Sequence, residues 1–443
     1  MNAAISSRWD GTEYLRKHQL SPLQIDTEPD PGLALVVTIP AHDEPDLLRT
    51  LESLCACRGT GDAVEIIVGV NRPEDSTPEL QARHARYFEQ ASEYAAQHST
   101  PGYRIHALDY PALPKRHAGV GLARKLIMDE AVARFGRARN DSGIIACLDA
   151  DCTVAPDYLQ QLVAHFRAHP KSPACSIYYE HPLSPHSDTP WLRGGIARYE
   201  LYLRYYVHAL RYAGFPHAYQ TVGSSMAVRS NVYQQEGGMN RRRGGEDFYF
   251  LSKIMALGGF SELKNTTVYP SARISHRVPF GTGRALSDWI TGEKDVWEVY
   301  PLAAFDALRT LCPRTPELWQ TPSSDATAIG WIAPELARYL DHNGFRERVD
   351  QMRRNAASAA TFQRRFFQWL NGFRIIKYLH WLRDEGQPQS VVESAAAELL
   401  RRGGVLEEGA PEDAEDLLDR YRRLDNHSQP LQFPQTDNRS ERH

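Results

Sequence analysis

The sequence predicts an α/β fold in which a mainly parallel sheet is flanked by helices. Continuous apolar, β-branched runs recur along the first 150 residues, and such runs are typical of strands buried on both faces. The segments between them have helical spacing, and strands that alternate with helices build parallel sheets. The four predicted strands are 33–39, 63–70, 103–108 and 143–148.

Helices are predicted between these strands and after them. Following the first strand, Leu47, Leu51 and Leu54 recur on one face of a helix. From about Ser287 the strand signal fades, and the rest of the chain has mostly helical spacing. A further strand is predicted within 220–233. The other predicted helices of the first half are 78–95, 117–135, one that begins near 156, and 196–214.

These patterns predict four parts of the chain. We expect an N-terminal extension, an α/β domain, a helical C-terminal extension and a polar tail that is disordered because it has little apolar surface to bury. Their predicted bounds are 1–30, 31–286, 287–424 and 425–443.

Composition narrows the function classes. The chain has 443 residues and a net charge of −4, which excludes the overall basic field of a nucleic-acid binder. Its six cysteines form no CxxC pair, so buried thiols in a reducing compartment are favoured over disulfides or zinc ligands. We found neither a signal-peptide core nor a run long enough to span a membrane, so a cytoplasmic protein is expected.

Two acids, Asp149 and Asp151, follow the strand 143–148. Carboxylates at i and i+2 past a strand end can converge on one divalent cation, and magnesium often takes one or two carboxylates together with substrate phosphates. Such a site suits a diphosphate leaving group, because the metal offsets the charge that develops as the bond breaks. The alternative is that both are ordinary loop acids.

Three segments in order resemble the signatures of the family-two glycosyltransferases. They are VVTIPAHDEPDLLRTLESL, LDADC and GGMNRRRGGEDFYFLSKI. The resemblance covers about Leu33 to Arg284 and implies the GT-A fold, a Rossmann-like sheet with a nucleotide-binding half and an acceptor-binding half. It further implies a hexosyltransferase-like enzyme that uses a nucleotide-diphosphate sugar.

The resemblance implies a set of donor-binding residues. The loop after the first strand would line the nucleotide, but His42 and Asp43 depart from the commoner Tyr-Asn, which leaves the base open. Asn71 is the nearest match to a base-contacting aspartate, and Asp149 would reach the ribose or the metal. For Lys115 and Arg124 a solvated surface cation is the alternative. The implied donor residues are Pro40, Ala41, His42, Glu44, Asn71, Lys115, Arg124, Asp149, Arg277 and Arg284.

The same resemblance implies a site for Mn²⁺ or Mg²⁺. Asp151 would be the principal ligand, Asp149 the second and His276 a third, since imidazole is a frequent ligand of such ions. A hydrogen-bonded histidine at a strand end is the alternative for His276. Arg277 and Arg284 flank a glycine-rich stretch suited to close over phosphates.

Asp247 is the predicted general base. By resemblance it would take the proton of an attacking acceptor hydroxyl in an inverting transfer, while Glu246 would bind the acceptor or hold the helix start. An acid pair that only caps the helix is the alternative. A retaining transferase with His276 as metal ligand and a non-catalytic sugar- or nucleotide-binding protein also remain open.

The expected partners are a nucleotide-diphosphate sugar and an acceptor that the sequence does not identify: a sugar, a lipid-linked sugar or a small molecule. Nucleic acid is not expected. The segment 364–382 is basic and aromatic, so it could lie on the inner face of a membrane, although a helix packed against the protein is favoured.

Overall fold

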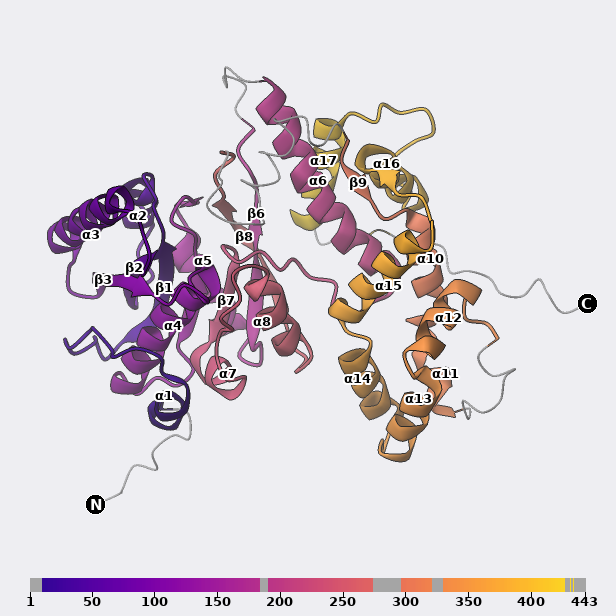
Figure 1. Ribbon diagram of the computed structural model, residues 1–443, viewed down its shortest axis with the longest axis horizontal. Coiled ribbons are helices and arrows are strands. Elements are labelled where there is room, and N and C mark those ends of the chain that lie inside the picture. Colours follow the sequence, from indigo (N-terminus) through magenta and orange to yellow (C-terminus); the bar gives the residue numbers. More distant parts are fainter. Residues whose placement is uncertain are drawn as a thin grey trace, which may run out of the picture. The chain divides into compact units, whose positions relative to one another are not determined.

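The structure, a computed structural model, describes residues 10–183, 190–273, 296–320 and 330–426, together with Leu431 and Phe433. The chain divides into two compact units (Figure 1). The first, called here the sheet unit, comprises Met1–Ser184 and Thr221–Ser287. The second, called the helical unit, comprises Pro185–Gln220 and Asp288–His443.

An eight-stranded sheet forms the centre of the sheet unit in the part of the chain that is described. Its order is β3-β2-β1-β4-β7-β6-β8-β5. The first four strands pair in parallel, whereas β7 and β5 run antiparallel to their neighbours. The strands are β1 Leu33–Ala41, β2 Ala63–Pro73, β3 Tyr103–Leu113, β4 Ile144–Cys147, β5 Thr153–Val154, β6 Ala174–Tyr179, β7 Met226–Arg229 and β8 Ser261–Tyr269.

Helices pack onto this sheet as predicted. α4 packs against β1 and β2, and α3 packs against β2 and β3. Leu35, Val36 and Val37 of β1 are fully buried, which explains why that strand is a continuous apolar run. The α/β class is confirmed. The helices of this unit are α1 Thr12–His18, α2 Leu47–Cys55, α3 Pro78–His98, α4 Val120–Arg137, α5 Tyr158–Ala168, α7 Ser230–Gln235 and α8 Glu246–Met255.

The strand order creates a switch point between β1 and β4. From β1 the chain adds β2 and then β3 on one side, and it returns to place β4 on the other side of β1. Connections therefore leave the carboxyl ends of β1 and β4 in opposite directions. In open α/β sheets ligands bind in the crevice that this divergence leaves.

The helical unit contains nine of the described helices and one small antiparallel pair of strands. α6 packs against α16 and α17, so this helix from the middle of the predicted α/β domain belongs to the helical unit. The predicted domain bounds themselves stay a prediction. The elements are α6 Pro190–Tyr212, β9 Glu298–Val299, α10 Leu302–Leu311, α11 Thr315–Gln320, α12 Pro334–His342, α13 Phe345–Arg354, α14 Ala359–Trp369, α15 Gly372–Asp384, β10 Ser390–Val391, α16 Val392–Arg402 and α17 Ala414–Asn426.

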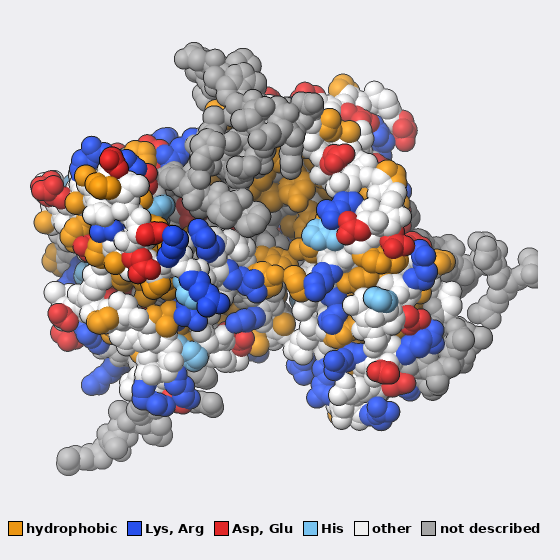
Figure 2. Space-filling view, in the orientation of Figure 1, with side chains coloured by type: hydrophobic (Ala, Val, Ile, Leu, Met, Phe, Trp, Pro, Cys, Tyr) orange, Lys and Arg blue, Asp and Glu red, His pale blue; other side chains and the backbone are white. Residues whose placement is uncertain are grey.

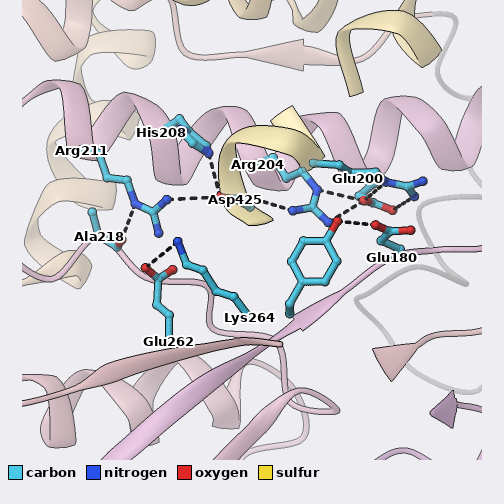
Figure 3. A network of polar contacts seen from close by, with 11 residues as sticks. Glu180, Glu200, Arg204, His208, Arg211, Ala218, Glu262, Lys264 and Asp425 are labelled. Carbon is cyan, nitrogen blue, oxygen red and sulfur yellow. Dashed lines mark hydrogen bonds and ion pairs between the residues drawn. The ribbon is translucent and has the colours of Figure 1, made fainter. Parts of the chain in front are cut away.

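A buried ionic cluster joins α17 to α6 (Figure 3). Asp425 accepts hydrogen bonds from Arg204, from Nε2 of His208 at 2.9 Å and from Arg211 at 3.2 Å. Glu200 accepts from Arg204 at 2.8 Å and is fully buried. The last turn of α17 is therefore held by charge as well as by packing, although the sequence placed Asp425 at the start of a disordered tail.

The segment 364–382 forms parts of α14 and α15. Its apolar residues are mostly buried inside the helical unit, among them Phe366, Phe367 and Ile375, while Arg364 and Lys377 are exposed. No helix in the described residues is long and apolar enough to cross a membrane. On the face seen in Figure 2, basic and acidic side chains are interspersed over each unit, as the small net charge leads one to expect.

Candidate active site

Arg124 lies at the centre of the candidate site. It is 2% exposed, and its guanidinium donates to Asp149 Oδ1 at 2.6 Å, to Glu246 Oε1 at 3.1 Å and to the Gly223 carbonyl at 2.6 Å. Burial opposes its charge, but the carboxylates of Asp149 and Glu246 outweigh burial and raise the pKa of Arg124. One arginine on α4 thus connects the end of β4, the loop before β7 and the start of α8.

Glu246 and Asp247 form the first turn of α8. Gly245 is the N-cap, in the left-handed region at φ 68°, so neither acid occupies the capping position itself. Glu246 is only 3% exposed, whereas Asp247 is half-buried and accepts from the Phe248 amide at 2.7 Å. The two acids therefore differ in access to a ligand.

Burial perturbs both acids in the same direction. It raises the pKa of Glu246 to about 7 and raises the pKa of Asp247, while Arg124 opposes both shifts. A carboxylate also raises the pKa of a neighbouring carboxyl group, because two negative charges repel each other. A buried acid pair beside one cation is an arrangement that can hold a proton near neutral pH.

Gly223 gives the two charged groups room to approach the backbone. A Cβ on this residue would lie 2.7 Å from Nη2 of Arg124 and 3.0 Å from Oδ2 of Asp247. A larger residue would have to displace one of these side chains. Gly223 therefore lies beside the candidate base.

The basic loop 241–245 packs over the start of α4. A Cβ on Gly121 would lie 2.3 Å from the Arg242 carbonyl oxygen, so glycine is needed for this close approach. Arg242 lies over the Tyr249 ring, 3.7 Å from its centroid, and Asn240 donates to the Glu246 carbonyl at 2.7 Å. These contacts connect the loop to both helices that carry the central charges.

The loop after β1 occupies the other side of the switch point. Pro40 and Ala41 end β1, and His42 Nδ1 lies 3.0 Å from the Asn71 carbonyl oxygen. Asn71 donates its amide hydrogens to the carbonyls of Ala41 and Gly69, both at 3.1 Å. A ligand that hydrogen-bonds to the Asn71 side chain would therefore have to donate an N–H to its side-chain oxygen. The predicted nucleotide residues of β1 and β2 are adjacent in space.

Arg273, which follows β8, was not predicted as a site residue. Its guanidinium contacts Glu44 and lies 3.3 Å from Asp46 Oδ2 and 3.5 Å from Asp151 Oδ2. This arginine therefore joins the loop after β1 to the second acid of LDADC. Only its position three residues before His276 could have indicated it.

Lys115 is a predicted donor residue that is not gathered here. It is largely exposed and pairs with Asp75 at 2.7 Å. His276, Arg277 and Arg284 lie outside the described residues.

Asp149 and Asp151 fit a cation that takes further ligands from its substrate. Their side chains are 39% and 28% exposed, and they supply the hard oxygen atoms that Mg²⁺ and Mn²⁺ accept. In the part of the chain that the structure describes, no cluster of three or more metal-ligating side chains occurs.

Residues 144–313 match the family model described as glycosyl transferase family group 2. This segment is similar to the family-two glycosyltransferases. The segment contains Asp149, Asp151, Glu246 and Asp247, and the predicted enzyme class, glycosyltransferase, is confirmed by it. The loop at 40–44 precedes it. No curated protein matches the chain.

Two solved structures are similar to the chain at low sequence identity. The S. aureus TarS fragment in complex with UDP-GlcNAc is 12% identical, with a TM-score of 0.37, over 80% of this chain and 92% of that chain. Mannosyltransferase PcManGT from Pyrobaculum calidifontis, in complex with GDP-Man and Mn²⁺, is 15% identical with a TM-score of 0.36, over 94% and 92%. Likenesses at these scores carry no argument. The α/β fold described above rests on the strand order of this chain itself.

Proposed function

We propose that the protein transfers a sugar from a nucleotide-diphosphate sugar to an acceptor hydroxyl, with inversion and with help from a divalent cation. The observation that carries the proposal is the gathering of Asp149, Glu246 and Asp247 around Arg124, at the carboxyl end of β4. A diphosphate donor is expected at such a switch point. The acids that the chemistry requires lie together there.

Asp247 is the better candidate for the base. It is more exposed than Glu246, and its raised pKa gives the carboxylate more affinity for a proton than an ordinary aspartate has. An acceptor hydroxyl within hydrogen-bond reach would lose its proton to Asp247 as its oxygen attacks the anomeric carbon. Glu246, buried against Arg124, then acts to hold the guanidinium and the start of α8.

Asp151 and Asp149 would hold the cation, whose chemistry is to offset charge on the departing diphosphate. Asp149 also accepts from Arg124, so its carboxylate connects the donor side of the site to the acid pair. The donors named in the comparisons, UDP-GlcNAc and GDP-Man, contain uracil and guanine, and both bases carry a ring N–H that could donate to the side-chain oxygen of Asn71. The identity of the base stays a prediction to be tested.

Retention of configuration is the second candidate mechanism, and it rests on His276 as a metal ligand. The two mechanisms differ in the anomeric configuration of the product, which proton coupling constants report. A sugar- or nucleotide-binding protein without activity would bind donors but release no nucleoside diphosphate. Cytoplasmic localisation and peripheral membrane contact through 364–382 stay predictions, and such contact would rest on the exposed basic residues.

A panel of nucleotide sugars tests the proposal. Uridine-, guanosine- and other nucleoside-diphosphate sugars are titrated by calorimetry with Mn²⁺ and then with a chelator, and nucleoside diphosphate release is followed with water and with sugar acceptors. We expect at least one donor to bind and react only with the cation. Asp151→Asn should weaken this binding more than Asp149→Asn. Equal affinity with Mn²⁺ and with chelator would contradict the metal role.

A further inference from the structure

Arg273 lies among three acids from two segments of the chain. Its Nη2 contacts Glu44 and is 3.5 Å from Asp151, and its Nη1 is 3.3 Å from Asp46. Glu44 is 5% exposed, whereas Asp46 and Asp151 are partly exposed. Three carboxylates gathered at this spacing repel one another, and the guanidinium offsets part of that repulsion.

The guanidinium occupies the side of Asp151 that faces the loop after β1. A divalent cation held by Asp151 would lie within a few ångströms of this positive charge, and like charges at that separation repel strongly when partly buried. The cation and Arg273 therefore compete for the same carboxylate. Binding of one favours departure of the other.

Arg273 also has an unused donor. Its Nε is buried and makes no hydrogen bond among the described residues. A buried polar group without a partner is costly, so a ligand oxygen that reached it would be stabilised. Arginine holds phosphate with the same paired N–H geometry that it uses for carboxylate.

We propose that Arg273 is a positioning residue that neutralises the acids in the donor-free protein and turns from Asp151 to the donor diphosphate when the divalent cation binds. The inference rests on the proposed function, because it requires a diphosphate donor and a cation at Asp151. It adds that the guanidinium of Arg273 suppresses metal binding until the donor arrives. Metal and donor would then bind together rather than in either order.

Titration of Mn²⁺ without nucleotide tests this competition. Arg273→Gln should bind Mn²⁺ about tenfold more tightly than the unaltered protein, because the competing charge is gone. With Mn²⁺ present, the same variant should bind a nucleoside diphosphate about tenfold more weakly, because the phosphate contact is lost. Arg273→Lys keeps the positive charge but loses the paired N–H groups of the guanidinium. Its Mn²⁺ affinity should therefore stay near that of the unaltered protein while its diphosphate binding weakens.

Arg83→Gln is the matched control. Arg83 pairs with Asp43 in the same loop at 2.7 and 3.0 Å, so it neutralises a different acid from the three around Arg273. Its loss should leave Mn²⁺ affinity unchanged. Adding Asp151→Asn to Arg273→Gln should abolish the gain, which locates the ion. Thermal unfolding confirms that each variant is folded.

Two outcomes separate the inference from the proposed function. If Arg273→Gln binds Mn²⁺ no more tightly than the unaltered protein while donor binding stays Mn²⁺-dependent, the role of Arg273 is wrong and the proposed function stands. If donor binding is indifferent to Mn²⁺ in every variant, both are wrong.

Discussion

Glu246 and Asp247 share a single arginine, and this is the feature at residue scale on which the mechanism depends. Arg124 bonds Glu246 directly and lies beside Gly223, against which Asp247 is placed. Two adjacent acids beside one buried cation are not ordinary carboxylates, because the charge of each group affects the protonation of the others. Their raised pKa values follow from burial and proximity.

This pair predicts a pH dependence of stability. Because the pKa of Glu246 is raised in the folded protein, from 4.5 to about 7, the folded state holds a proton that the unfolded chain releases. The stability contributed by the pair is therefore complete below about pH 4.5 and is lost as pH rises through about 7. Glu246→Gln cannot ionise, so its free energy of unfolding should fall less over this window, by on the order of 2 kcal/mol. Urea unfolding at pH 5, 6, 7 and 8 measures the difference.

Glu236→Gln is the control for that series. Glu236 follows α7 in the same unit and is less buried than Glu246, so this substitution should leave the pH profile unchanged. A Glu246→Gln profile that runs parallel to that of the unaltered protein would contradict the raised pKa of Glu246 in the folded protein.

At the scale of elements, the helical unit depends on how α17 is held against α6. Asp425 is buried and meets Arg204, His208 and Arg211 (Figure 3). Burial opposes its charge, but His208 and the arginines outweigh burial and lower the pKa of Asp425. The last turn of α17 is therefore held by ion pairs, and their charged groups must lose water when the protein folds.

Asp425→Asn should destabilise the helical unit. It leaves buried cations without their carboxylate, and removal of one partner from a buried ion pair costs about 3–5 kcal/mol. Asp419→Asn, on the same helix, removes only an exposed partner of Arg423, and such pairs contribute about 0–1 kcal/mol. Calorimetry of the full chain should show a clearly lower unfolding temperature for Asp425→Asn alone. Equal temperatures for both variants would show that the buried cluster contributes little.

At the scale of the whole molecule, the sequence predicted those strands and helices whose signal lies in neighbouring residues of the chain. The strands β1 to β4 are apolar runs, and the helices between them keep their spacing, so both were found. β8 was not predicted because it is a half-exposed strand with polar residues between its buried ones. β6, a buried strand of six residues, was also missed, and β5 has only two residues. The assignment of α6 to the helical unit depends on packing that sequence spacing does not contain.

The site was predicted unevenly for the same reason. Acids that end strands or open helices were recognised from local signatures. The role of Arg124 was not, because its partners lie 25 and 122 residues away, at Asp149 and Glu246. Arg273 was missed because its contact with Glu44 spans 229 residues. Long-range charge pairs leave no periodic signal in a sequence.

The measurement that tests the central claim most directly is the turnover of Asp247→Asn. It uses the donor and acceptor identified by the panel, with donor affinity measured separately and with Asp62→Asn, a loop acid paired with Arg167, as control. Asparagine keeps the size of the side chain but cannot take the proton. We predict near-normal donor affinity and a fall in turnover of about a hundred- to ten-thousandfold. Near-normal turnover in Asp247→Asn would contradict the assignment of Asp247 as the base.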